Sequence, residues 1–380
     1  MRFSPALRAS FVAAVTGAVL LVAACGSSGN GSSSGNHPSG SSSSTQVKTG
    51  NPSSPVTLQE AGSSLVYPYL QQLTSPLKAK YSNITLSPAA GGSGVGQSEA
   101  ASGTIDLGGS DAYLTPAQFQ QYPGLMNVPI AISSQAVNFN LKGISTLNLS
   151  GGVLAQIYEG KITNWNDQAI ANLNPGVTLP NQTIVPIRRV DSSGDTFIFT
   201  SFLSQTNSAW QNGPSLGTTV TWPSVPGELA ESGNPGMVNG LKATPGGIAY
   251  VGISAESDAL QAGAGEASLQ NKAGKFVKPD ATTVQSAVQA GAKSIPANLA
   301  ASLIYLPGAQ SYPIVNYEYL IVQSKQTDPN KALAIRSFLD WSISPDGGAS
   351  ESNLAAVNFQ PLPKSVVPAV DKAINKIQAG

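Results

Sequence analysis

One short stretch combines the residue types that suit anion binding, RRVDSSGDT at residues 188–196. An apolar strand over residues 183–187 is expected to lead into it, and an apolar helical pattern follows. Small residues at a helix start leave backbone N–H groups exposed at the positive end of the helix dipole. Arg189 would add a planar cationic donor that matches a tetrahedral oxyanion. The alternative interpretation makes Ser193 and Asp195 ordinary helix caps and Arg189 a surface charge.

Two upstream segments repeat the order of strand, small-residue turn and helix. The first combines a strand over 56–60, the turn AGSS and a helix over 65–81 with leucines at helical spacing. The second combines a strand over 83–88, a Gly-rich turn around Ser93 and a helix over 97–102. Each turn alone is explained by a βα connection in a doubly wound sheet. Three such turns with available hydroxyls favour an anion site.

A fourth stretch, TIDLGGSD, alternates like a strand and ends at Asp111. Ligands of open α/β sheets bind outside the carboxyl ends of the strands, where Asp111 would lie. A carboxylate suits an anion site only if the anion carries a proton that the carboxylate can accept.

The chain has one histidine, His37, and one cysteine, Cys25, both near the N-terminus. The rest of the sequence therefore offers no imidazole for a catalytic triad or a zinc site, and no intrachain disulfide can form. No GxSxG elbow follows a predicted strand, since the one match, GSSSG at residues 31–35, lies in the Gly/Ser-rich segment, and Walker A and complete GxGxxG motifs are absent. An enzyme that uses Ser93 or Ser193, such as a phosphatase or an acyl hydrolase, is the second hypothesis, but no histidine could activate either serine. No cofactor, metal or catalytic residue is expected.

The N-terminus has the pattern of an export signal. Residues 1–24 contain two arginines, no acid and an apolar run of about fourteen residues, which is short of the roughly 20 needed to cross a bilayer. The run ends in VAAC, which resembles the lipobox of bacterial lipoproteins. By that resemblance Cys25 becomes the first residue of the mature chain and carries the lipid, such as palmitate. The alternative is an unmodified export signal with an incidental cysteine. Residues 25–55 are rich in Gly and Ser, which predicts a flexible tether.

Charge and length narrow the partners and the fold class. The chain has 20 basic and 20 acidic residues, so removing Arg2 and Arg8 with the signal leaves 18 against 20, a net charge of −2. A sparsely charged, near-neutral chain argues against nucleic acid and against an anionic membrane face as partners. The remaining length is enough for two domains, and strands interleaved with helical patterns predict α/β architecture.

The motifs AGSSL, AAGGSGVG, SGTIDLGGSDAYL and RRVDSSGDTFIFT, in this order, resemble those of the phosphate-binding proteins of bacterial phosphate ABC transporters. Further resembling stretches span most of the chain after the tether, at 157–176, 234–254, 311–322 and 359–367. The Gly-Asp-Thr version together with the lipobox resembles actinobacterial members of the family.

The resemblance implies a two-lobed periplasmic-binding-protein fold of type II, with mixed sheets flanked by helices and a two-strand hinge. Lobe one would comprise residues 56–132 and 314–380, and lobe two residues 138–312. Such proteins close on phosphate in the cleft between the lobes without breaking a bond.

The same resemblance assigns roles at the site residue by residue. Hydroxyl hydrogen bonds to phosphate would come from Ser64, Ser93 and Ser193, and backbone N–H groups from Leu65 and Gly194. Asp111 would accept the proton of phosphate. Arg189, held in place by Asp191, would be the sole cation. Asp195 stands where many members of the family carry threonine. A hydroxyl donor is thus replaced by an acceptor, which leaves the preferred protonation state of phosphate open.

The function implied is that of a monomeric, lipid-anchored receptor at the extracytoplasmic face of the cell membrane, which captures inorganic phosphate and delivers it to an ABC permease. A receptor for another tetrahedral oxyanion, or an adhesion protein that kept the fold, remains as an alternative. The four tryptophans are expected to pack in the core or on a lobe surface rather than to contact ligand, namely Trp165, Trp210, Trp222 and Trp341. Residues 253–300 show a mixed helical pattern and no recognisable chemistry.

Overall fold

The computed structural model describes residues 46–293 and 295–380. The predicted signal peptide, Cys25 and most of the predicted tether lie outside the described residues. The described end of the predicted tether is held on the fold: the N–H of Gly50 donates to Ser337 Oγ over 2.9 Å and that of Ser53 donates to Asn330 Oδ1 over 3.0 Å, so the prediction of a flexible tether up to residue 55 is wrong for these residues. Within the described part of the chain, no helix is long and apolar enough to cross a membrane.

The first part of the chain follows the predicted order of strands and helices. Its elements are β1 (Val56–Gly62), α1 (Tyr67–Lys80), β2 (Ile84–Ser87), α2 (Ser93–Ser102), β3 (Leu107–Ser110), α3 (Pro116–Gln121) and β4 (Leu125–Phe139). In α1 the buried side chains Tyr69, Leu70, Leu73 and Leu77 recur at helical spacing, as the sequence predicted. Helix α2 begins at Ser93 rather than at residue 97, because Gly92 adopts a φ of 90° and lets the chain turn directly into the helix.

The middle of the chain alternates strands and helices. Its elements are β5 (Thr146–Leu149), α4 (Gly151–Tyr158), α5 (Gln168–Ala171), β6 (Val185–Arg189), α6 (Gly194–Thr206), α7 (Ser208–Asn212), β7 (Leu229–Glu231), α8 (Gly233–Ala243), β8 (Gly247–Gly252), α9 (Ile253–Gln261), β9 (Gly265–Gln270), β10 (Phe276–Val277) and α10 (Ala281–Gly291). The stretch without readable chemistry, 253–300, thus contains two helices and two strands.

The last part returns to the first strands. Its elements are β11 (Val315–Gln323), β12 (Lys325–Gln326), α11 (Pro329–Ser342), α12 (Glu351–Ala355), α13 (Val367–Ile374) and β13 (Gln378–Ala379). Strand β11 begins within the resembling stretch 311–322 and ends one residue beyond it.

Most strands join one mixed sheet in the order β2-β1-β3-β11-β4-β8-β6-β7, with β9 beside β4, β5 and β10. Strands β1, β2 and β3 run parallel to one another, as do β6, β7 and β8, whereas β4 and β11 are antiparallel to their neighbours. The long strand β4 pairs with β11 up to Ser134 and with β8 from Gln135 onward. One strand therefore connects two groups of parallel strands, and the predicted α/β class with mixed sheets is confirmed.

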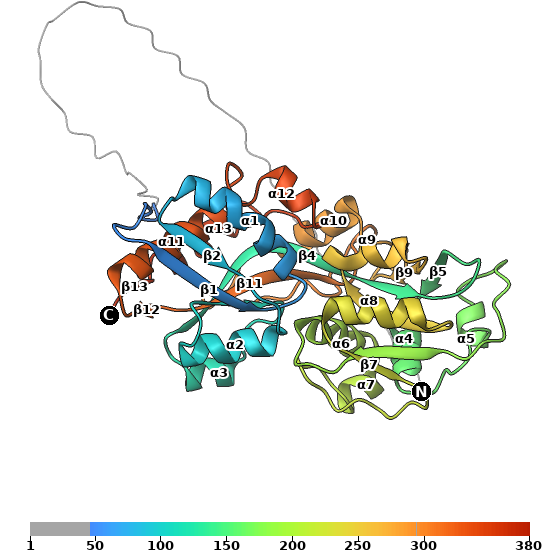
Figure 1. Cartoon of the computed structure of the whole chain (residues 1–380). Helices are drawn as coiled ribbons and strands as arrows, with labels where there is room; N and C mark the ends of the chain where they lie inside the picture. The colour runs from blue at the N-terminus through green and yellow to red at the C-terminus, as the bar shows by residue number, and fades with distance from the viewer. Residues whose placement is uncertain (1–45, 294) are drawn as a thin grey trace, which may run out of the picture. The chain divides into compact units, whose positions relative to one another are not determined.

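Helices cover both groups of strands, as Figure 1 shows. Helices α1, α2 and α11 pack on β1, β2 and β3, while α6, α8 and α9 pack on β8 and its neighbours. Trp165 and Trp210 are fully buried, Trp341 is 7% exposed, and Trp222 stacks on Tyr250 with ring centroids 6.2 Å apart. The prediction that the tryptophans pack within the protein is confirmed.

Candidate functional site

Helix α6 starts directly after the strand that carries Arg189. The strand β6 runs two residues further than predicted, so Arg188 and Arg189 lie in the strand and not in the turn. Ser193 caps α6, since its Oγ accepts a hydrogen bond of 3.3 Å from the N–H of Thr196. The turn between strand and helix is thereby fixed by local chemistry, which agrees with the capping role that sequence reasoning left open for Ser193.

Arg189 is 2% exposed, and acids surround its guanidinium. Its Nε donates to Asp191 Oδ1 over 2.8 Å, its Nη2 donates to Asp191 Oδ2, and its Nη1 donates to Asp195 Oδ2 over 2.8 Å. Burial alone would raise the pKa of Asp191, but the hydrogen bonds and charge of Arg189 lower it below its ordinary value. The bonds to described residues use three of the five guanidinium N–H groups, and two remain to face another ligand.

The carboxylate of Asp195 points toward these polar groups and does not cap its own helix. Its Oδ2 accepts hydrogen bonds from Arg189 and from Asn234 Nδ2 (2.8 Å), and its Oδ1 accepts one from Gln135 Nε2 (3.0 Å). Burial, followed by the nearby charge of Asp111, raises the pKa of Asp195 to about 6. An internal anion thus occupies donors that an external anion could use.

Asp111 follows β3 and is 1% exposed. Its Oδ1 accepts a hydrogen bond from Ser63 Oγ, and its Oδ2 accepts one from Ser93 Oγ over 3.4 Å. The Ser93 oxygen in turn accepts the backbone N–H of Asp111 over 3.1 Å. Burial raises the pKa of Asp111, although these hydroxyls and Arg189 act in the opposite direction.

The turn after β1 differs in detail from the roles that the resemblance implies. The backbone N–H of Leu65 donates to Ser63 Oγ over 3.0 Å, and Ser64 Oγ accepts from the backbone and side-chain nitrogens of Asn234 over 3.0 and 3.2 Å. Leu65 is therefore already paired, and the hydroxyl of Ser64 joins the turn after β1 to the start of α8.

Four backbone N–H groups at three helix starts have no partner among the described residues. They belong to Ser64, Ser93, Gly194 and Asp195. All four residues are buried. Unpaired buried N–H groups are rare because each costs about as much as a lost hydrogen bond. Their convergence at the positive ends of α1, α2 and α6 suits an anion.

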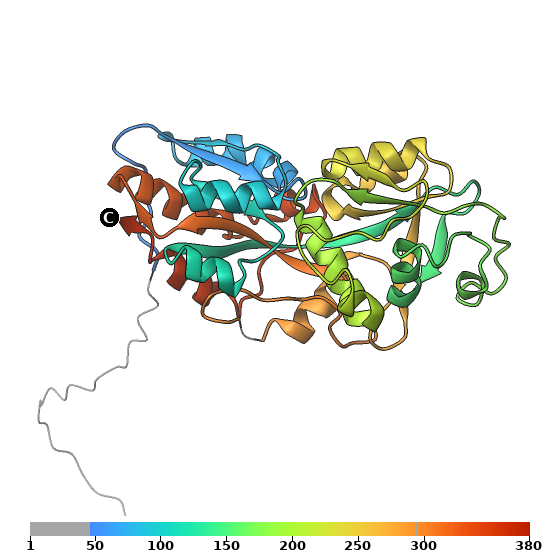
Figure 2. The same ribbon diagram turned by 90° about the horizontal axis from the view of Figure 1, so that it is seen from below.

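The starts of α2 and α6 lie against each other. The N–H of Gly94 donates to the carbonyl of Ser192 over 3.0 Å. A Cβ on Gly194 would lie 2.3 Å from Ser93 Oγ and 2.4 Å from Asp111 Oδ2, so only glycine permits this approach. Figure 2 shows α6, in lime green, beginning beside the cyan helix α2. The structure thus brings together all of the predicted site residues that it describes.

Sequence reasoning missed several polar residues that lie against this group, among them Ser63, Gln135, Asn234, Tyr250, Asn316 and Glu318. Gln135 and Glu318 interrupt apolar strands, and a buried polar residue within such a run is a signal that could have been followed. Asn234 contacts Ser64, which is far away in the sequence, and no local pattern indicates that contact.

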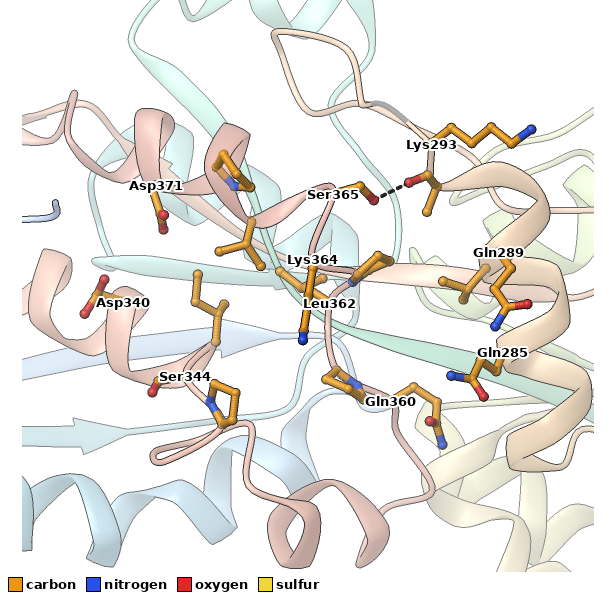
Figure 3. Close-up of a pocket in the computed structure, with 18 residues that line it drawn as sticks. Gln285, Gln289, Lys293, Asp340, Ser344, Gln360, Leu362, Lys364, Ser365 and Asp371 are labelled. Atoms are coloured by element: carbon orange, nitrogen blue, oxygen red, sulfur yellow. Dashed lines mark hydrogen bonds between the residues drawn. The ribbon is translucent and has the colours of Figure 1, made fainter. Parts of the chain in front are cut away.

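A groove of about 960 Å³ lies in another part of the molecule, between α10 and the segment from α11 to α13 (Figure 3). Prolines and aliphatic side chains line most of it, with Asp340 and Asp371 at one end and Lys293 at the other. None of the predicted site residues lines this groove, so the groove is separate from the candidate anion site.

Comparisons with known proteins agree with the motifs. The model of the PBP superfamily domain matches residues 40–346. The phosphate-binding protein PstS of Methanocaldococcus jannaschii is 32% identical over 86% of this chain and 87% of its own length. The phosphate-binding protein PstS3 of Mycobacterium bovis is 33% identical over 84% of this chain and 86% of its own length.

Solved structures share the fold. A high affinity periplasmic phosphate-binding protein (PfluDING) bound with phosphate matches with a TM-score of 0.65 and 23% identity, over 84% of this chain and 93% of that one. A putative phosphate ABC transporter substrate-binding protein from Clostridium perfringens matches with a TM-score of 0.58 and 16% identity, over 81% and 100%. At these identities the structures support the fold alone. The family model and the curated relatives show that the chain belongs to the PBP superfamily and, within it, to the PstS phosphate-binding proteins.

Proposed function

We propose that this protein binds inorganic phosphate outside the cytoplasm and delivers it to an ABC permease. The observation that carries the proposal is the convergence of unpaired backbone N–H groups at three helix starts with one buried guanidinium. Such groups stabilise a multivalent anion without any bond being made or broken. The names of the relatives supply the choice of phosphate among anions.

Hydrogen-bond donors would hold phosphate, and carboxylate acceptors would select its protonated forms. The donors are the hydroxyls of Ser64, Ser93 and Ser193, the backbone N–H groups of Gly194 and its neighbours, and the remaining N–H groups of Arg189. The N–H of Leu65 donates to Ser63 Oγ over 3.0 Å, so Leu65 contributes only if phosphate replaces Ser63 as its acceptor.

The acceptors are Asp111 and Asp195. Each can be satisfied by a proton on the ligand. Sulfate has no proton at neutral pH, so its oxygens would face buried carboxylates, at a cost of several kcal/mol in typical cases. This selection by protons distinguishes phosphate from a fully ionised oxyanion of the same shape.

We further propose that residues 56–132 and 314–380 form one lobe and residues 138–312 the other. Strands β4 and β11 would be the hinge, because β4 changes its pairing partner between Ser134 and Gln135. The receptor would act as a monomer that Cys25 anchors to the membrane, with the residues before the fold as a tether.

Calorimetry with phosphate, sulfate and molybdate tests the proposal. Tight binding of phosphate with much weaker binding of sulfate is expected. Equal affinity for sulfate, or tighter binding of molybdate, would favour a receptor for another oxyanion. Hydrolysis of a chromogenic phosphate ester by the purified protein would contradict a role restricted to binding.

A further inference from the structure

Glu318 lies in the middle of β11 with no solvent exposure. The pairing with β4 shifts register between Glu318 and Tyr319, so the strand bends at this residue. Its Oε1 accepts a hydrogen bond from Ser133 Oγ on β4, whereas its Oε2 has no donor among the described residues. A buried carboxylate oxygen without a donor is strongly unfavourable, and a proton on the carboxyl group removes that cost.

Glu318 lies opposite Asp111, because the antiparallel register of β11 and β3 pairs Tyr319 with Ser110 and the next residues along are Glu318 and Asp111. Two buried carboxyl groups that face each other in this way are strongly disfavoured when both are ionised, so the pair holds a proton. Burial, followed by the charge of Asp111, raises the pKa of Glu318 well above its usual range.

The charged groups around Glu318 also favour its neutral form. Asp111 faces it from the end of β3, Asp195 acts on it from α6, and Tyr319 is its neighbour on β11. Arg189 is the one cation whose charge reaches Asp111 among the described residues, and Asp191 and Asp195 already engage it. A fourth ionised carboxylate would have no counter-charge here.

We propose, on the basis of the proposed function, that Glu318 is a positioning residue that keeps its proton and donates it in a hydrogen bond to Asp111. Asp111 therefore stays ionised and acts as the acceptor that selects protonated phosphate. If the proton moved to Asp111 instead, Asp111 would become a donor. A donor at that position would accept sulfate as readily as phosphate. Glu318 would thus set the ligand specificity without touching the ligand.

Two variants separate this role from a packing role. Glu318→Gln keeps a donor beside Asp111 that cannot lose its proton, and it should bind phosphate within about threefold of the wild type. Glu318→Leu fills the space but removes the donor, which raises the pKa of Asp111 because the bond from Glu318 lowers it. Phosphate affinity at neutral pH should then fall about tenfold or more below that of the wild type, this difference should shrink as the pH rises, and sulfate affinity should increase.

Calorimetry with phosphate and sulfate on folded wild type, Glu318→Gln and Glu318→Leu gives the comparison. The proposal would be overturned if Glu318→Leu kept the wild-type selectivity for phosphate over sulfate and the wild-type pH profile. It would also be overturned if Glu318→Gln lost as much of this selectivity as Glu318→Leu. Infrared spectroscopy of the ligand-free protein is independent of phosphate binding. A protonated-carboxyl component that persists at about pH 8 in the wild type should be missing from Glu318→Gln, beside a band that remains because burial raises the pKa of Glu60 and of Glu256 to about 8. Absence of this component from the wild type would overturn the proposal, whereas a wild type that shows this component but binds no phosphate would contradict the proposed function instead.

Discussion

Replacing Asp195 by threonine should change how phosphate binding depends on pH. The carboxylate accepts hydrogen bonds from Arg189, Asn234 and Gln135, and its pKa is raised to about 6, first by burial and then by the charge of Asp111. A phosphate ion that binds beside it meets a second acceptor in addition to Asp111. Phosphate must therefore arrive with two protons, or Asp195 must take up one.

The magnitudes favour proton uptake over repulsion. Two unit charges 4 Å apart repel by about 4 kcal/mol at an effective dielectric constant of about 20. Protonating a group two pH units above its pKa costs about 2.7 kcal/mol. Around pH 8 the complex is therefore expected to contain two protons, shared by phosphate and Asp195.

The sign of the pH dependence follows from the proton count. At pH values above the second pKa of phosphate, the free ion carries one proton and free Asp195 carries none, so binding takes up one proton. Kd should then rise about tenfold per pH unit, or about a hundredfold over two units. In Asp195→Thr the hydroxyl can donate to the dianion, no proton is taken up, and Kd should stay constant within about twofold over that range.

Titration calorimetry of both proteins, in buffers with different ionisation heats, measures Kd and the proton count together. Asp195→Asn is the matched control, since it keeps the size of the side chain and removes its charge. Identical pH profiles and proton counts for wild type and Asp195→Thr would show that the carboxylate does not face bound phosphate. The two-acceptor reasoning would then be wrong.

Three further substitutions test the site and the anchor. Arg189→Ala should weaken phosphate binding by about 30-fold to several thousand-fold, equivalent to about 2–5 kcal/mol. Arg189→Lys should restore little of this affinity, because lysine lacks the planar guanidinium. An Arg189→Ala protein whose calorimetric affinity is within a few-fold of the wild type would place the site elsewhere. Gly194→Ala puts a Cβ 2.4 Å from Asp111 Oδ2 and should weaken binding about tenfold or more and also lower the melting temperature, because the starts of α2 and α6 must move apart to make room. Wild-type affinity and wild-type melting temperature would mean that α6 can move away at no cost. Cys25→Ser should move the protein from the membrane fraction to the soluble fraction, and a variant that still sediments with membranes would disprove the lipid anchor.

Local patterns were enough to predict the elements that carry the site. Glycine and serine turns between an apolar strand and an amphipathic helix indicated α1, α2 and α6, and the alternation before Asp111 indicated β3. The errors lie at element boundaries. Residues 188 and 189 belong to β6 because they pair with residues of β7 that lie 42 positions further along the chain, and the sequence of β6 alone does not reveal that partner.

Side-chain directions were beyond sequence reasoning. Nothing local indicates that the carboxylate of Asp195 turns toward Arg189 and Gln135 while Ser193 alone caps the helix. The pairing of Leu65 with Ser63 is equally hidden, because it depends on the turn geometry after β1. These contacts arise only when distant strands align, and no periodicity records them.

At the proposed phosphate site, the balance of charge would make selection, and not attraction, the main task. Four carboxyl groups, those of Asp111, Asp191, Asp195 and Glu318, accompany the single guanidinium of Arg189. Even with Glu318 neutral, the charges sum to −2, so long-range electrostatics oppose the entry of an anion. Binding must therefore come from short-range donors, the backbone N–H groups and hydroxyls, whose strength depends on contact. An anion without protons gains these donors but must also face the carboxylates, whereas a protonated anion converts that repulsion into hydrogen bonds. The excess of acid thus makes the proton on the ligand the feature that is recognised.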